Sequence, residues 1–137
     1  MKEGSLSPDR QVRVACVQMR PRVGEKTENI AASCRYIETA AREGAELIVM
    51  PELCNSGYLF ETMAEARELS EEIPGGETCR VWSELAAKLG VHIVAGINER
   101  AGDKLFNSAA VIGPEGHLAT YRKVHLWDKE NLFFTPG

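Results

Sequence analysis

The distribution of apolar and polar residues along the first third of the chain predicts strands and a helix in alternation. Residues 12–19 alternate in polarity and are rich in β-branched side chains, which predicts a strand with at least one buried face. Between residues 25 and 43, apolar positions recur at three- and four-residue steps, which predicts a helix that ends at Gly44. Residues 47–50 are fully apolar, as in a central strand covered on both faces. The first elements are therefore a strand, a helix and a strand.

The next stretch predicts a loop and two more helices. Residues 51–60 contain Asn55, Ser56 and Gly57, which favour irregular backbone at the carboxyl end of the preceding strand. Helical patterns then cover residues 61–72 and 77–89. The sequence Pro-Gly-Gly at 74–76 cannot easily continue a helix, so it separates the two.

Strands dominate the remainder of the predicted fold. Residues 91–97 have the composition of a buried strand, and residues 98–104 that of a polar turn. Two antiparallel strands are expected at 105–112 and 117–122, joined by a Gly-Pro-Glu-Gly turn. Residues 124–137 show no clear period. The whole pattern predicts one α/β unit with parallel strands first and a hairpin later.

Composition and charge narrow the class of function. The chain has 137 residues, of which 44% are hydrophobic and 26% charged, values typical of a globular domain. Its formal net charge is -4, and the sequence shows no cluster of basic residues. Both observations argue against nucleic acid as a partner. A small-molecule ligand is the better hypothesis.

The sequence also bears on location and on metals. Residues 1–11 form a polar leader without the apolar centre of a signal peptide, and no run is long enough to span a membrane. We therefore expect a cytoplasmic protein without a membrane partner. The four cysteines form no C-x-x-C pair and there is no histidine-rich cluster, so we expect reduced thiols and no metal.

Two charged residues lie where an α/β sheet usually places its site. Glu52 directly follows the apolar strand, at its carboxyl end. Lys123 ends the second hairpin strand, and His125 follows it, so that an ammonium and an imidazole would project near one strand end. Solvated surface roles are the alternative for Glu52 and Lys123, and a structural hydrogen-bonding role is expected for His125.

Two segments around these residues resemble signatures of the nitrilase superfamily of carbon–nitrogen hydrolases. The first is Pro51-Glu52-Leu53 followed by Ser56-Gly57-Tyr58, and the second is the run of residues 121–126, YRKVHL. Further agreement comes from VQ at 17–18, GINE at 96–99, FNSA at 106–109, and Glu130 before Phe133 and Phe134. Several segments in the expected order make a specific resemblance, and it covers residues 12–137.

The resemblance implies a partial αββα sandwich and a Glu–Lys–Cys triad that hydrolyses nitriles, amides or carbamoyl groups without a cofactor. By position in the motifs, Glu52 would be the general base, Lys123 the cation beside the oxyanion, and Glu130 a second glutamate. Tyr58 would lie near the substrate. Many members self-associate, so a homo-oligomer is expected.

The nucleophile of the resembled family lies on a later strand, and residues 12–137 are expected to be the amino-terminal part of that domain, truncated before it. Cys16 and Cys34 are expected in the core, and Cys79 has no base nearby. Cys54 is close to Glu52 in sequence, but we expect it to pack in the loop. The isolated chain is therefore predicted to be inactive.

Two other functions compete with the hydrolase reading. A truncated hydrolase half could serve as a non-catalytic oligomerisation or regulatory module. A doubly wound nucleotide-binding domain shares the early strand–helix–strand pattern, but it needs a glycine-rich phosphate loop, which residues 19–24 do not form. Amide, carbamoyl and nitrile substrates all stay open, with a slight preference for the first two.

Overall fold

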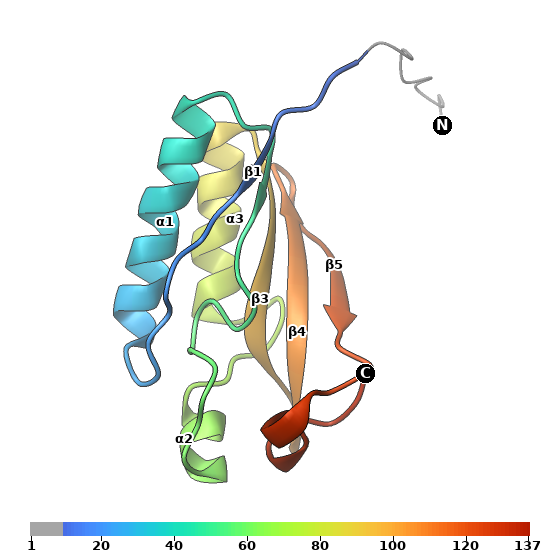
Figure 1. The fold of residues 1–137 in the computed structure, drawn as a ribbon. Coiled ribbons are helices and arrows are strands. Elements are labelled where there is room, and N and C mark those ends of the chain that lie inside the picture. The colour runs from blue at the N-terminus through green and yellow to red at the C-terminus, as the bar shows by residue number, and fades with distance from the viewer. Residues whose placement is uncertain (1–9) are drawn as a thin grey trace, which may run out of the picture.

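One mixed sheet of five strands organises the molecule, and the computed structural model describes it from residue 10 to residue 137 (Figure 1). The elements are, in chain order, β1 (Val14–Cys16), α1 (Lys26–Arg42), β2 (Leu47–Val49), α2 (Met63–Glu68), α3 (Glu77–Leu89), β3 (His92–Ala101), β4 (Lys104–Gly113), β5 (Gly116–Arg122) and the 3-10 helix η1 (Asp128–Leu132). The strand order is β1-β2-β3-β4-β5; β1, β2 and β3 run parallel, and β4 and β5 add antiparallel pairings. The predicted α/β class is confirmed. Most of the polar leader, residues 1–9, lies outside the described part.

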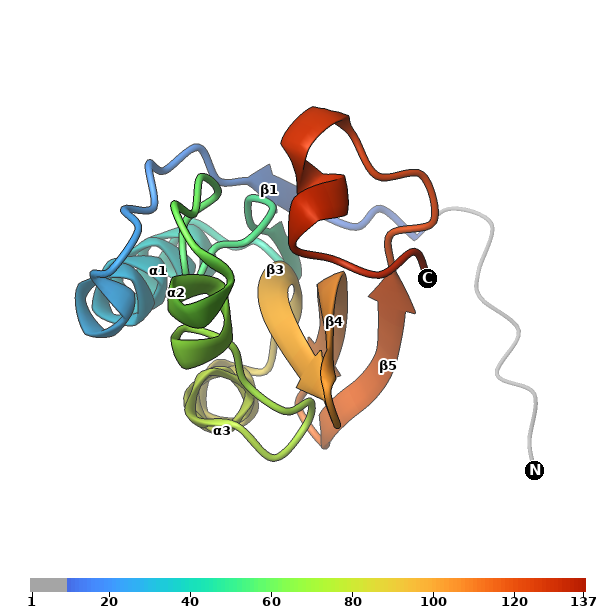
Figure 2. The same ribbon diagram turned by 90° about the horizontal axis from the view of Figure 1, so that it is seen from below.

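Helices α1 and α3 pack side by side on one face of the sheet (Figures 1 and 2). Ile48, Ile93 and Ile112 point from three strands into this core and are fully buried. Trp82 of α3 is fully buried as well, and its indole N–H donates a 2.8 Å hydrogen bond to Ser33 Oγ of α1. In the described part of the chain, no helix is long and apolar enough to cross a membrane.

The opposite face of the sheet carries apolar side chains that are not covered by helices. One cross-strand row on this face joins Cys16, Val49, Val94 and Val111. The expected burial of β2 on both faces is therefore wrong for residues 10–137, where Val49 is only half-buried. The core position expected for Cys16 is also wrong. Its side chain is exposed on the uncovered face of the sheet, and β1 is the outermost strand.

Several element boundaries differ from the predicted ones. Strand β1 has three residues instead of eight, and helix α2 is shorter than the predicted segment 61–72. Helix α2 ends early because the backbone of Glu71 bonds to β3 instead, with Glu71 N donating to Asn98 O and Arg100 N donating to Glu71 O. The predicted polar turn at 98–104 is mostly strand, since β3 and β4 pair as far as Ala101 and Lys104.

The segment without a clear period in the sequence is tied down by backbone hydrogen bonds. Thr135 N donates to Leu105 O at 2.8 Å, and Gly137 N donates to Lys123 O at 2.9 Å. Helix η1 therefore lies near the beginning of β4 (Figure 1). A second, smaller apolar cluster joins the loop after β2 to α2, β4 and the last residues of the chain. Its members are Leu53, Phe60, Ala66, Leu69, Leu105 and Phe134.

Gly96 in β3 allows the loop after β2 to lie directly on the sheet. Gly96 N donates to Pro51 O at 3.1 Å, and Cys54 N donates to Gly96 O at 2.9 Å. A methyl group at this position would lie 2.3 Å from Leu53 N and 2.6 Å from Glu52 Cα. Backbone atoms cannot move aside as a flexible side chain does, so only glycine fits.

We predict that Gly96→Ala destabilises the protein by about 2 kcal/mol, the usual effect of overpacking a tight site. Gly75→Ala is the matched control, because nothing lies within 4 Å of its added methyl group; its effect should stay within about 0.5 kcal/mol. Urea denaturation of both variants measures the difference. Equal stabilities for the two variants would show that the loop does not depend on this close approach.

Candidate active site

Four polar residues from separate elements meet at the carboxyl ends of the parallel strands. Glu52 lies in the loop that follows β2, and Lys123 directly follows β5. Asn107 is on β4, and Glu130 is in η1. These segments lie close together because β2, β3 and β5 run in the same direction and end on the same side of the molecule. Helix η1 lies on this side as well, near the beginning of β4 (Figure 1).

The Lys123 ammonium group is the centre of this cluster. Its Nζ atom is 2.7 Å from Glu52 Oε1, and 2.9 and 3.1 Å from the two carboxylate oxygens of Glu130. About 29% of the Lys123 side chain is exposed, against 43% for Glu52 and 3% for Glu130. The structure therefore brings together all three predicted catalytic residues, and neither Glu52 nor Lys123 is a freely solvated surface residue.

Asn107 also belongs to the cluster, although it was not predicted as a site residue. Its side-chain amide donates to Glu52 Oε1 at 2.7 Å and to Glu130 Oε1 at 2.6 Å, so it bridges the two carboxylates. Its backbone carbonyl accepts a 2.9 Å hydrogen bond from Lys123 N. The signal available in the sequence was the polar pair Asn107-Ser108 inside an otherwise apolar strand.

Glu130 is held from its own helix as well as from the sheet. Trp127 N donates to Glu130 Oε2 at 2.6 Å, while Phe133 N and Phe134 N donate to the Glu130 carbonyl. Hydrogen bonds to the side chain and the carbonyl group of Glu130 thus stabilise helix η1. Glu130 is only 4% exposed. Its carboxylate accepts hydrogen bonds from Lys123, Asn107 and the backbone N–H of Trp127.

These contacts shift the ionisation of the cluster in favour of the charged forms. Partial burial lowers the pKa of Lys123, but the hydrogen bonds and charges of Glu52 and Glu130 outweigh this and raise it. Burial raises the pKa of Glu130, and hydrogen bonds from Lys123, Trp127 and Asn107 bring it below its ordinary value. Lys123 is therefore an ammonium group and Glu130 a carboxylate at neutral pH, and the two form an ion pair.

Two hollows flank the cluster. The larger has a volume of about 450 Å³ and opens on the uncovered face of the sheet, where Glu52, Lys123 and Tyr121 line it together with Val94 and Ala109. The smaller, of about 50 Å³, lies on the other side of Glu130 and is walled by Tyr58 and Phe60 among other apolar residues. Tyr58, the predicted substrate neighbour, therefore lies beside Glu130 in the smaller hollow.

Tyr58 is close enough to the cluster to respond to its charge. Its pKa is raised by partial burial first, and then by the negative charges of Glu130 and Glu52. The phenol is consequently neutral at physiological pH and can act as a hydrogen-bond donor. His125 is an exposed residue, which gives no support to the hydrogen-bonding structural role expected for it.

A separate ion pair fixes the end of β5, next to Lys123. The Arg122 guanidinium group donates to both carboxylate oxygens of Glu99, at 2.9 and 2.6 Å, and lies 3.9 Å from the centre of the Phe106 ring. Glu99 is 4% exposed and also accepts a hydrogen bond from Ser108 Oγ. Since neighbouring residues on a strand point to opposite sides, this anchor on Arg122 sets the direction of Lys123.

None of the four cysteines lines either of these two hollows. Cys54 and Cys79 are buried, and desolvation raises the pKa of each thiol to about 12, which disfavours the nucleophilic thiolate. Cys34 is partly buried and packs against the core, as predicted. Among residues 10–137, no three His, Cys, Asp or Glu side chains are grouped to hold a metal ion.

The pKa of Glu130 leads to a prediction about acid stability. Because it is lowered in the folded state, its stabilising contribution is complete above the ordinary value of about 4.3 and is lost as the pH falls through the folded value. Glu130→Gln should lower the free energy of unfolding at pH 7 by about 2 kcal/mol. Below about pH 4.3, the free energy of unfolding should fall less steeply with decreasing pH in the variant than in the wild type. Glu84→Gln, at an exposed position of α3, is the control.

Urea denaturation between pH 3 and 7, roughly the range of carboxyl titration, measures both effects. An unchanged acid slope in Glu130→Gln would show that Glu130 is not held as a charged group in the folded protein.

Several known proteins have sequences similar to this chain. The family model for the carbon–nitrogen hydrolases matches residues 13–136. A nitrilase from Pyrococcus abyssi is 46% identical over 126 residues, which are 92% of this chain and 48% of that protein. The omega-amidase NIT2 of Danio rerio is 41% identical over 105 residues, or 75% of this chain and 36% of the relative. The chain thus spans half or less of the length of these relatives.

Solved structures agree with the sequence relatives. A protein of the CN-hydrolase superfamily from Xanthomonas campestris, XC1258, superposes with a TM-score of 0.80 at 26% identity, over 92% of this chain and 46% of that one. An N-terminal amidase has a TM-score of 0.83 at 22% identity, over 92% of this chain and 31% of that chain, which shows a shared fold. The chain belongs to the carbon–nitrogen hydrolase family.

Proposed function

We propose that this chain supplies the general base and the oxyanion-binding cation of a thiol hydrolase that cleaves non-peptide carbon–nitrogen bonds. The observation that carries the proposal is the contact of the Lys123 ammonium group with both Glu52 and Glu130, at the rim of an open hollow. The contact between Glu52 and Lys123 supports two members of the Glu–Lys–Cys triad that the family resemblance implies.

Glu52 has the geometry of a general base. Its two hydrogen bonds, from Lys123 and Asn107, both go to Oε1. Among the described residues, Oε2 has no donor, so this oxygen is available to take a proton. A cysteine thiol with a pKa of about 8.5 is mostly protonated at neutral pH and needs such an acceptor as its sulfur attacks.

The same carboxylate serves the later steps. In amide hydrolysis, the sulfur–carbon bond forms, Glu52 takes the thiol proton and passes it to the departing nitrogen, and ammonia leaves a thioester behind. Glu52 then takes a proton from water as the water attacks the thioester, and returns it to the sulfur. The products are a carboxylic acid and the free thiol, so that no external oxidant, reductant or cofactor is consumed.

Lys123 stabilises charge that develops only in the tetrahedral states. Its raised pKa keeps it cationic throughout the cycle, and its contacts with Glu52 and Glu130 fix the ammonium group before substrate binds. Preorganised charge of this kind lowers the barrier rather than the energy of the bound substrate. Glu130 and Asn107 hold the cation and the base in register, and Tyr58 forms a wall beside them.

The nucleophilic cysteine is proposed to come from residues outside these 137, because no described cysteine faces the hollow that Glu52 and Lys123 line. On this proposal residues 12–137 are the amino-terminal part of the domain, and the isolated chain is inactive. The nitrilase and omega-amidase relatives support nitriles and amides as candidate substrates. The family resemblance adds carbamoyl compounds, and we propose amides and carbamoyl compounds before nitriles. We further propose a cytoplasmic homo-oligomer.

The uncovered apolar face of the sheet favours one alternative function. Val14 and Leu118 on this side are 50% and 52% exposed, and such a surface usually contacts another polypeptide. The chain would then be a non-catalytic oligomerisation or regulatory module. A reading frame that stops after Gly137, together with soluble oligomers that release no ammonia, would favour this alternative.

The test is an ammonia-release assay on the longest polypeptide that the reading frame encodes, with a panel of amides, carbamoyl compounds and nitriles. We predict that Glu52→Gln and Lys123→Ala each lower kcat at least about 100-fold, the usual effect of losing a general base or an oxyanion partner. Lys88→Ala, at an exposed position on α3, should retain full activity. Wild-type activity in a folded Lys123→Ala protein would refute the role of the cation.

A further inference from the structure

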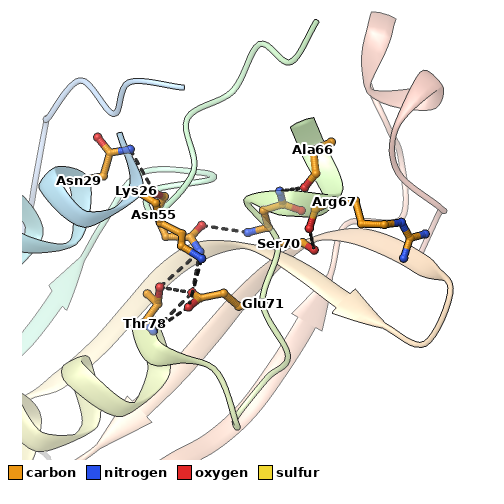
Figure 3. Close-up of polar contacts among 9 residues, drawn as sticks. Lys26, Asn29, Asn55, Ala66, Arg67, Ser70, Glu71 and Thr78 are labelled. Atoms are coloured by element: carbon orange, nitrogen blue, oxygen red, sulfur yellow. Dashed lines mark hydrogen bonds and ion pairs between the residues drawn. The ribbon is translucent and has the colours of Figure 1, made fainter. Parts of the chain in front are cut away.

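A second buried carboxylate lies behind the loop that carries Glu52. Glu71 is 6% exposed and follows α2, and Thr78 in the first turn of α3 donates to it from both its backbone N–H and its hydroxyl group. Lys26 Nζ is 3.7 Å away. Figure 3 shows these side chains converging on one point between the helices and the loop. Nothing in the proposed mechanism uses this group.

Asn55 connects this carboxylate to the loop. Its side chain donates to Glu71 Oε2 at 3.0 Å and accepts from Asn98 N of β3 at 3.1 Å. Its backbone carbonyl accepts a 3.1 Å hydrogen bond from Asn29 Nδ2 of α1. Asn55 is fully buried, so these contacts are made without competition from water.

The loop has no regular secondary structure, and among the described residues its backbone bonds to the sheet only through Gly96. Leu53 takes a positive φ of 45°, and Gly57 N closes a turn onto Leu53 O at 2.9 Å. Glu52 is on the exposed side of this turn and Asn55 on its buried side, three residues later. A shift of Asn55 would therefore move the backbone of Glu52 against Lys123.

We propose that Glu71, acting through Asn55, is a positioning residue that holds the Glu52 carboxylate on Lys123. The inference rests on the proposed function, in which the placement of Glu52 matters for rate. Neither Glu71 nor Asn55 touches the cluster of Glu52, Lys123 and Glu130, so their effect passes through the loop backbone.

The polarity of the Asn55–Glu71 contact provides the test. Asn55 needs a donor toward Glu71 and an acceptor toward Asn98 N, and a carboxamide supplies both. Asn55→Asp turns the donor into an acceptor and places two carboxylates face to face. Adding Glu71→Gln restores the contact in the opposite direction, since Gln donates to Asp while its oxygen still accepts from the backbone N–H of Thr78.

The experiment compares kcat and KM of the wild type, Asn55→Asp and the double variant Asn55→Asp/Glu71→Gln, all in the longest encoded polypeptide. Asn55→Asp should lower kcat by about 100-fold with little change in KM, as expected when a reacting group is displaced by roughly 1 Å. The double variant should recover kcat to within about tenfold of the wild type. A double variant no more active than Asn55→Asp overturns the proposal.

Stability is controlled separately. Leu85→Ala removes a buried side chain from the core of α3, away from the loop, and should destabilise the protein while leaving kcat unchanged. If it lowers kcat as much as Asn55→Asp does, the network is merely structural. If Asn55→Asp does not fold, Glu71→Gln alone decides: kcat should fall about tenfold at unchanged KM, and an unchanged kcat overturns the proposal.

Crystal structures separate this inference from the proposed function. If the wild type releases no ammonia, the hydrolase function fails, and the distance from Lys123 Nζ to Glu52 Oε1, 2.7 Å in the wild type, becomes the readout. It should lengthen beyond hydrogen-bonding range in Asn55→Asp and return in the double variant. An unchanged distance in Asn55→Asp refutes the positioning role whether or not the protein is an enzyme.

Discussion

The Lys123 ammonium group lies between two carboxylates, and the elements around the site are arranged to keep it there. An uncompensated charge at a partly buried position is costly, and so is a buried carboxylate such as Glu130 without partners. Each group therefore stabilises the charged form of the other. Asn107 bridges the two acids from β4, and η1 closes over Glu130 with its backbone N–H groups.

Periodicity in the sequence was sufficient to predict helices α1 and α3 and the succession of parallel strands first and a hairpin later. Helices α1 and α3 match their predicted segments within about one residue, because one apolar stripe on each packs against the sheet. The polar turn expected at 98–104 was wrong, because Asn98 and Glu99 lie in a strand, where Asn98 bonds to Ala66 and Asn55 and Glu99 to Arg122. Tertiary contacts of this kind have no local signature in a sequence.

The candidate site divides in the same way. Glu52, Lys123 and Glu130 were predicted by motif, and the structure places both glutamates in contact with Lys123, while their catalytic roles stay predictions. Asn107 belongs to the segment FNSA that contributes to the resemblance, but it was not predicted as a site residue, because an asparagine in a strand gives no indication of which acids it will bridge. The burial expected for Cys16 failed because the sequence does not show that β1 is the edge strand, with its outward positions uncovered in the described part.

The central claim is that this chain holds the base and the cation while a cysteine outside residues 1–137 holds the substrate. Acid quenching of the longest encoded polypeptide during amide turnover, followed by peptide mass spectrometry, locates the acyl thioester. The account predicts an adduct on a cysteine beyond Gly137 and none on Cys16, Cys34, Cys54 or Cys79. An acyl group on one of these four cysteines would contradict it.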